Sequence, residues 1–248
     1  MLLELVVEFA TLVALVLCGY AGLRAYLRLR RPQLVELFLR RRFAILGSAA
    51  LLIVGIKVFE DVLGKESGVI DELVLRFVHT HVPPGLDAFF GAVTRSGSAV
   101  VLIPAAALVA IAFECNKHRS EAGLVMVSTG LASILVYVIK ALTGRERPAL
   151  WETQWYWGSS FPSGHTLSTA AFSTAVALCI ARLWPRSSYW AAGVAMVWIF
   201  LVALSRLVLG VHWPSDVLAA MCLGMLLSLM MSMGFDLYRH RTLRGNCS

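Results

Sequence analysis

Three clusters of polar residues interrupt the long apolar stretches of this 248-residue chain. The clusters are Lys140-Ala-Leu-Thr-Gly-Arg-Glu-Arg-Pro148, Pro162-Ser-Gly-His165 and Ser205-Arg-Leu-Val-Leu-Gly-Val-His-Trp-Pro-Ser-Asp216. Ionisable side chains at the ends of apolar spans are costly, so they are candidates for function. Together these clusters supply cationic side chains, a helix start, two histidines and a carboxylate. Such an electropositive pocket favours a multiply charged anion, and phosphate fits best.

The first chemical role of these residues is to bind the anion. Lys140, Arg147 and Arg206 are cations of the kind that hold phosphoryl oxygens. Ser163 suits a helix N-cap, and the amide of Gly164 would lie in the first helical turn. Free amides at a helix start, together with the positive end of the helix dipole, form a ready anion site.

The second role is proton and nucleophilic chemistry, for which histidine is the usual residue. Asp216 follows His212 by four residues, close enough for the carboxylate to orient the imidazole around the turn at Pro214. His165 is the second histidine. Taken singly, a span-end lysine often only reaches the headgroups, and an interfacial histidine is often merely polar. The joint occurrence of the three clusters favours a site.

The composition shows what kind of chain positions these clusters. Hydrophobic residues make up 58% and charged residues 15%, and the mean hydropathy is +0.75. A soluble domain is about 45–50% apolar and about 25% charged. Disorder is excluded as well, because it requires low hydrophobicity and high charge. The composition therefore predicts an all-α polytopic membrane protein, a bundle of spanning helices.

Seven apolar runs are expected to span the membrane, with six as the alternative count. They are about Leu5–Leu23, Phe43–Leu63, Ser98–Phe113, Ala122–Leu142, His165–Leu183, Tyr189–Leu209 and Val217–Phe235. With the N-terminus outside and the C-terminus inside, the inside segments hold 14 of the 22 Lys and Arg residues, as the positive-inside rule expects. The basic segment 24–42 then orients the chain, a site for anionic lipid being the alternative. All three clusters fall on the outside face.

Two connections on the outside are distinctive. In segment 64–97, Leu73, Phe77 and Val78 predict one face of a short interfacial helix that ends at two prolines. Connection 149–161 is aromatic, which is typical of an interfacial belt and equally of a flap beside the pocket. Its aromatic residues are Trp151, Trp155, Tyr156, Trp157 and Phe161.

The three clusters have the patterns K-x6-R-P, P-S-G-H and S-R-x5-H-x3-D, in that order, with apolar runs between them. In this the chain resembles the type 2 phosphatidic acid phosphatases, integral-membrane lipid phosphatases related to vanadium haloperoxidases. The resemblance covers about Phe43 to Phe235. It implies one membrane domain over residues 1–248, with an extra span and basic loop at 1–42, a six-span catalytic core at 43–235 and a basic tail at 236–248.

The resemblance also implies a role for each site residue. His212 would be the nucleophile that forms a phosphohistidine, Asp216 its partner, and His165 the general acid. The residues implied to bind the phosphoryl oxygens are Lys140, Arg147, Arg206, Ser163 and Gly164. Because three cationic side chains supply the charge that other enzymes take from magnesium, we expect metal-independent turnover, with no metal site and no cofactor.

The expected function is hydrolysis of a lipid phosphomonoester or pyrophosphate at the outer face of a bacterial cytoplasmic membrane. Candidate substrates are undecaprenyl pyrophosphate, phosphatidylglycerophosphate, phosphatidic acid and lipid A phosphate. The alternative is a lipid phosphotransferase that uses the same histidine. An anion transporter is less favoured, because transport sites normally lie near the bilayer midplane. The expected partners are the lipid phosphate and membrane lipids, with neither nucleic acid nor an obligate protein partner.

Overall fold

The computed structural model describes residues 2–32, 35–40, 42–83, 85–151 and 158–245, apart from the side chains of some residues near the ends of helices. Within these ranges the regular structure is helical throughout, which confirms the expected all-α class. The helices are α1 (Leu2–Arg30), α2 (Val35–Arg40), α3 (Arg42–Leu63), α4 (Gly68–His81), α5 (Asp87–Ser96), α6 (Ala99–Cys115), α7 (Arg119–Thr143), α8 (Gly164–Leu183), α9 (Ser188–Val208) and α10 (Pro214–Gly245).

Five of the described helices, α3 and α7 to α10, are long and apolar enough to cross a bilayer. Helices α5 and α6 are bent by 46° at their junction and make a sixth span if the pair is counted as one. The sequence predicted the apolar run of α6 but left α5 in a connection, and the structure corrects this. The expected first span lies within α1, and the count of seven stays a prediction.

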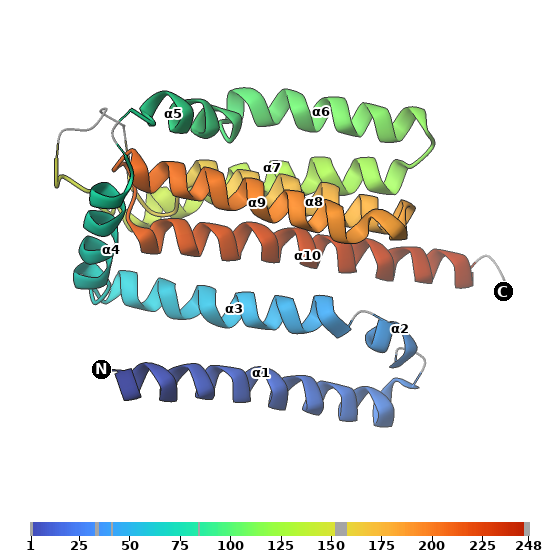
Figure 1. The fold of residues 1–248 in the computed structure, drawn as a ribbon. Coiled ribbons are helices and arrows are strands. Elements are labelled where there is room, and N and C mark those ends of the chain that lie inside the picture. The colour runs from blue at the N-terminus through green and yellow to red at the C-terminus, as the bar shows by residue number, and fades with distance from the viewer. Residues whose placement is uncertain (1, 33–34, 41, 84, 152–157, 246–248) are drawn as a thin grey trace. The chain divides into compact units, whose positions relative to one another are not determined.

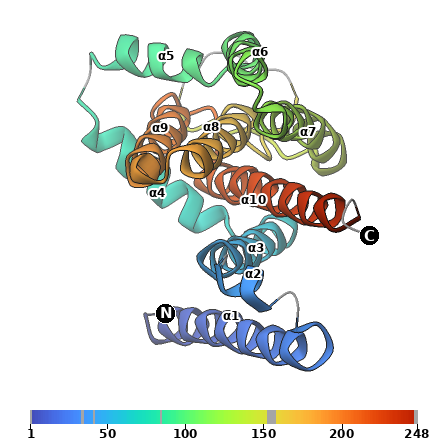
Figure 2. The same cartoon turned by 90° about the vertical axis from the view of Figure 1, so that its right-hand side faces the viewer.

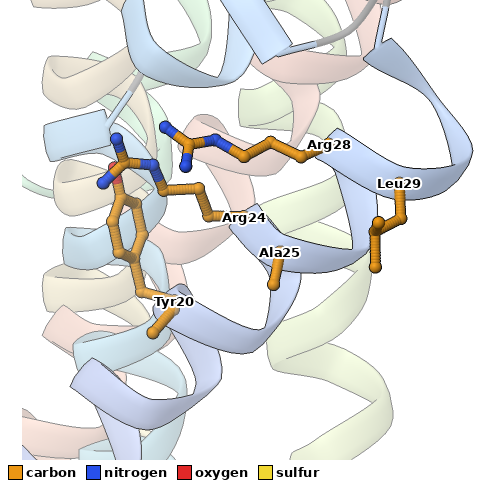
Figure 3. A pocket seen from close by; sticks show the side chains of 6 residues that line it. Tyr20, Arg24, Ala25, Arg28 and Leu29 are labelled. Atoms are coloured by element: carbon orange, nitrogen blue, oxygen red, sulfur yellow. The ribbon is translucent and has the colours of Figure 1, made fainter.

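The chain forms two compact units, residues 1–57 and residues 58–248. In the first unit, Tyr20 of α1 stacks on Phe38 of α2, with ring centroids 4.9 Å apart. Figure 3 shows a hollow on α1 along which Tyr20, Arg24 and Arg28 lie. None of the three polar clusters lies in this unit. The domain boundaries expected at residues 42 and 235 stay a prediction.

The second unit is organised around α8. Helix α8 contacts α6, α7, α9 and α10, which run alongside one another in Figures 1 and 2. Close approach of helices in membranes relies on small residues. Gly224 of α10 is such a residue, because a Cβ atom there would lie 2.4 Å from the carbonyl oxygen of Leu167 and 2.8 Å from Cβ of Ala170, both on α8.

Helix α4 lies across the end of this bundle at which α9 ends and α10 begins (Figure 1). It is amphipathic: Leu73 and Phe77 are exposed, whereas Asp71 and Leu75 are buried. A helix is therefore present where the sequence predicts one, and it ends before Pro83; its place at the membrane interface stays a prediction. Proline 84 lies outside the described residues.

Candidate active site

The three polar clusters meet at the end of the bundle that α4 crosses. Lys140 lies in the last turn of α7, and Arg206 lies in the last turn of α9. Each of these helices is followed by a glycine with positive φ, Gly144 at 57° and Gly210 at 64°, so the chain turns back sharply there. His165 of α8 is close enough to interact electrostatically with Lys140, Arg147, Arg206 and His212. The structure thus brings the predicted site residues together.

His212 lies in the turn between α9 and α10, with 2% of its surface exposed. Its Nδ1 is 3.4 Å from Oδ2 of Asp216, and its Nε2 is 3.4 Å from a terminal guanidinium nitrogen of Arg147. A guanidinium only donates hydrogen bonds, so Nε2 faces it with a lone pair and the proton belongs on Nδ1. Both distances are longer than an ordinary hydrogen bond.

The electrostatic environment keeps the His212 imidazole neutral. The pKa of His212 is lowered to about 4, mainly by burial and also by the positive charges of Arg206 and Arg147, whereas Asp216 acts to raise it. A pKa this far below 7 favours the neutral imidazole at physiological pH, and a neutral ring with its proton on Nδ1 carries a lone pair on Nε2.

Asp216 is completely buried at the start of α10 and has a partner for each oxygen. Oδ2, which faces His212, accepts a hydrogen bond from the amide of Trp213 at 2.9 Å. Oδ1 accepts one from the guanidinium of Arg145 at 2.5 Å. The backbone carbonyl of Asp216 accepts the amide of Ser163 at 3.2 Å, which ties the start of α8 to the start of α10.

Two of the predicted phosphate-binding cations share one acceptor. Lys140 Nζ donates to the carbonyl of Ser159, and Arg147 donates to the same oxygen at 3.5 Å. Arg147 also donates to the carbonyl of Val211, beside His212, at 2.8 Å. These carbonyls are neutral acceptors that fix the direction of both side chains.

Arg206 is the third cation, and only 1% of its surface is exposed. One of its terminal nitrogens donates to Oγ1 of Thr94 on α5 at 2.6 Å. Helix α5, which the sequence did not predict, therefore helps to orient a site residue.

Ser163 occupies the N-cap position of α8, as the sequence predicts, but its side chain makes no capping bond to the helix backbone. Its hydroxyl instead lies 3.0 Å from Oγ1 of Thr166. The first amides of a helix have no acceptor within the helix. The amides at Gly164 and His165 are thus suited to bind an anion, and their role in phosphate binding stays a prediction.

Other residues of this region were not indicated by the sequence. Asp71 on α4 pairs with Arg145 at 2.7 Å, and Thr94 orients Arg206. No sequence motif or spacing distinguishes Asp71 and Thr94 from ordinary polar residues at a membrane interface. Trp151 stacks on His79, with centroids 4.0 Å apart, but residues 152–157 of the aromatic connection lie outside the described part of the chain.

The donor set of the site is suited to an anion. Within the described ranges, no three His, Cys, Asp or Glu residues are grouped in a way that could hold a metal ion. Lys140, Arg147 and Arg206 are cations at this end of the bundle, and positive side chains of this kind can stabilise negative charge on a phosphoryl group directly.

Comparison with known proteins agrees with this geometry. Residues 121–238 match the family model of the PAP2 superfamily. Phosphatidylglycerophosphatase B of Bacillus subtilis (strain 168) is 30% identical over 159 residues, which cover 62% of this chain and 76% of the relative. Phosphatidylglycerophosphatase B of Escherichia coli (strain K12) is 41% identical over 63 residues, 25% of this chain and 24% of the relative.

The fold is shared as well. The crystal structure of a transmembrane PAP2-type phosphatidylglycerolphosphate phosphatase from Bacillus subtilis superposes with a TM-score of 0.69 at 25% identity, covering 77% of this chain and 96% of that one. Residues 121–238, which match the family model, contain all three motifs of the predicted signature, and these motifs lie at one end of the helical bundle. The chain is therefore an integral membrane protein that belongs to the PAP2 superfamily.

Proposed function

We propose that this membrane lipid phosphatase removes phosphate from its substrate through a phosphohistidine formed on His212. The observation that carries the proposal is the position of the buried His212 between Arg147 and Asp216, with Nε2 directed toward the cation. A nucleophile must lie in line with the leaving oxygen, and its partner must stabilise the cation that forms.

In the first step, Nε2 of His212 attacks phosphorus and the bond between phosphorus and the lipid oxygen breaks. Asp216 stabilises the positive imidazole ring that results. His165 gives a proton to the departing oxygen as the general acid.

In the second step, water attacks the phosphohistidine. Neutral His165 takes a proton from this water, the bond between Nε2 and phosphorus breaks, and inorganic phosphate leaves. The acid of the first step is thereby restored.

The negative charge on the phosphoryl oxygens is stabilised without a metal. Lys140, Arg147 and Arg206 supply three positive charges, and the hydroxyl of Ser163 and the amide of Gly164 add hydrogen bonds. Such groups are effective because they are fixed before the reaction and lie away from bulk water. The contacts of Arg147 with Val211 and of Arg206 with Thr94 support this assignment.

Phosphatidylglycerophosphate is the substrate that we propose first, because both relatives compared above are phosphatidylglycerophosphatases. The test is phosphate release by the purified full-length chain in detergent. The lipids compared are phosphatidylglycerophosphate, phosphatidic acid, undecaprenyl pyrophosphate and lipid A 1-phosphate, with the His212→Ala variant as the blank. Fastest release from phosphatidylglycerophosphate is expected; no release from any of the four by folded protein would contradict the proposal.

The intermediate can be tested separately. With a lipid labelled in the terminal phosphate, single-turnover samples quenched in alkaline detergent should contain labelled protein. A phosphohistidine loses its label in acid and keeps it in base. Acid-stable label, or equal labelling of His212→Ala, would argue for a different nucleophile.

We also propose that the site faces the outside of a bacterial inner membrane, with the C-terminus in the cytoplasm. The distribution of the 14 basic residues in inside segments supports this orientation. A fluorescent protein fused to the C-terminus should fold and fluoresce, whereas a periplasmic alkaline phosphatase fused there should be inactive. The opposite pattern would reverse the orientation.

A further inference from the structure

A buried carboxylate from outside the three motifs lies next to His212 and Asp216, which are called the dyad below. Asp71 is on α4, and only 2% of its surface is exposed. Two apolar residues on the opposite side of the same helix are exposed: Leu73 is 64% exposed and Phe77 is 60% exposed. A charged group buried on the inward face of an interfacial helix is costly unless it is paired, so its partners indicate its role.

Both oxygens of Asp71 are engaged by groups that also reach the start of α10. Oδ1 accepts the amide of Ser215 at 2.8 Å, and Oδ2 accepts the hydroxyl of Ser215 at 2.6 Å. Oδ2 also forms an ion pair with Arg145 at 2.7 Å. Arg145 in turn lies 2.5 Å from Oδ1 of Asp216 and 2.8 Å from the hydroxyl of Ser215.

Arg145 is therefore shared between two carboxylates, one from α4 and one from the dyad. Its bond to Oδ1 of Asp216 leaves Oδ2 directed at His212. The charge of Asp71 balances that of Arg145, so Asp216 retains its ability to stabilise a positive imidazole. Without Asp71, Asp216 would be the one carboxylate of this pair left to balance the charge of Arg145.

We propose that Asp71 is a positioning residue which acts through Arg145 and Ser215 to hold Asp216 in the orientation and charge state that His212 needs. This inference rests on the proposed function, because it concerns the same reaction. Asp71 does not contact the phosphate ligands Lys140, Arg147 and Arg206 through any of the bonds described above. Its loss should therefore lower kcat and leave KM nearly unchanged.

The test is steady-state kinetics on the purified full-length chain, with dioctanoyl phosphatidic acid in detergent as the probe. Asp71→Asn keeps the shape of the side chain and removes its charge. We expect kcat to fall by about 10-fold to 100-fold, by analogy with the loss of hydrogen-bond partners that orient metal-binding side chains, with KM within about twofold. The matched control is Glu72→Gln, the neighbouring residue, which pairs with Arg76 on the exposed side of the helix. Its kcat should equal that of the wild type.

A double-mutant cycle separates positioning from a merely structural role. If Asp71 acts through Asp216, then Asp71→Asn should not lower kcat any further in the Asp216→Ala variant. Should Asp71→Asn fail to give folded protein, Arg145→Lys replaces it, because an ammonium group cannot join both carboxylates as the guanidinium does. It should show the same loss in kcat at constant KM.

Three outcomes would overturn the inference: wild-type kcat in Asp71→Asn, a loss confined to KM, or equal losses with and without Asp216. None of these would affect the proposed function, which is tested by phosphate release from the four lipids and by the activity of His212→Ala. The two proposals can therefore be judged separately in one set of assays.

Discussion

The protonation of His212 gives the sharpest quantitative prediction of this site. A pKa of about 4 for His212 follows first from its burial and then from the nearby charges of Arg206 and Arg147. At pH 5 about one imidazole in ten would then be protonated, compared with about 97% of imidazoles with the ordinary pKa of 6.5. The neutral nucleophile should thus persist far below the pH at which an exposed histidine loses its lone pair.

The same shift has a consequence for stability. Between about pH 6.5 and pH 4 the unfolded chain binds a proton on this histidine and the folded chain does not. Acidification through this range therefore lowers the free energy of unfolding, by roughly 3 kcal/mol at its lower end. The folded protein must therefore be stable enough to keep His212 buried and neutral while the unfolded chain gains this proton.

The assay is NMR of the full-length protein in detergent, with isotope-labelled histidines and the pH lowered from 7.5 to 4.5. The His212 signal is the one missing from the His212→Gln variant. It should keep the chemical shift of a neutral ring, protonated on Nδ1, down to about pH 5. A midpoint at pH 6 or above would refute the electrostatic argument and the neutral-nucleophile assignment.

Three further predictions test other parts of the structure. Gly224→Ala should destabilise the protein by about 1–3 kcal/mol, because its Cβ would lie 2.4 Å from a backbone oxygen of α8. Thermal unfolding in detergent measures this loss. The control is Gly130→Ala, where a Cβ meets nothing within 4 Å and the thermal midpoint should not fall. Thr94→Val removes an acceptor of Arg206 and should raise KM about tenfold. The control Thr80→Val should leave KM unchanged. A KM of Thr94→Val equal to that of the wild type would argue against a phosphate-binding role for Arg206. Activity should survive EDTA, and a loss restored by magnesium would contradict charge stabilisation by side chains.

Much of the fold could be predicted because membrane spans follow from continuous apolar runs. The run His165–Leu183 matches α8 within one residue, and Tyr189–Leu209 matches α9 as closely. Helix α5 was missed because its ten residues mix polar and apolar types and are too short to give a spanning signal.

The motif residues could be found because their spacing along the chain is specific. Asp71 and Thr94 could not be found from the sequence, since each makes its contact with a segment far away along the chain. Asp71 contacts Arg145, and Thr94 contacts Arg206. A carboxylate on an interfacial helix is ordinary in a sequence. Only the folded arrangement shows that this one is buried against the dyad.

The most direct test of the central claim is phosphate release by folded His212→Ala. If Nε2 of His212 is the nucleophile, the variant should lose at least about 1,000-fold in kcat on the best lipid substrate, because the remaining groups only bind and stabilise. The variant should keep the elution profile and thermal midpoint of the wild-type protein. Activity within about tenfold of the wild type in such protein would contradict the phosphohistidine mechanism.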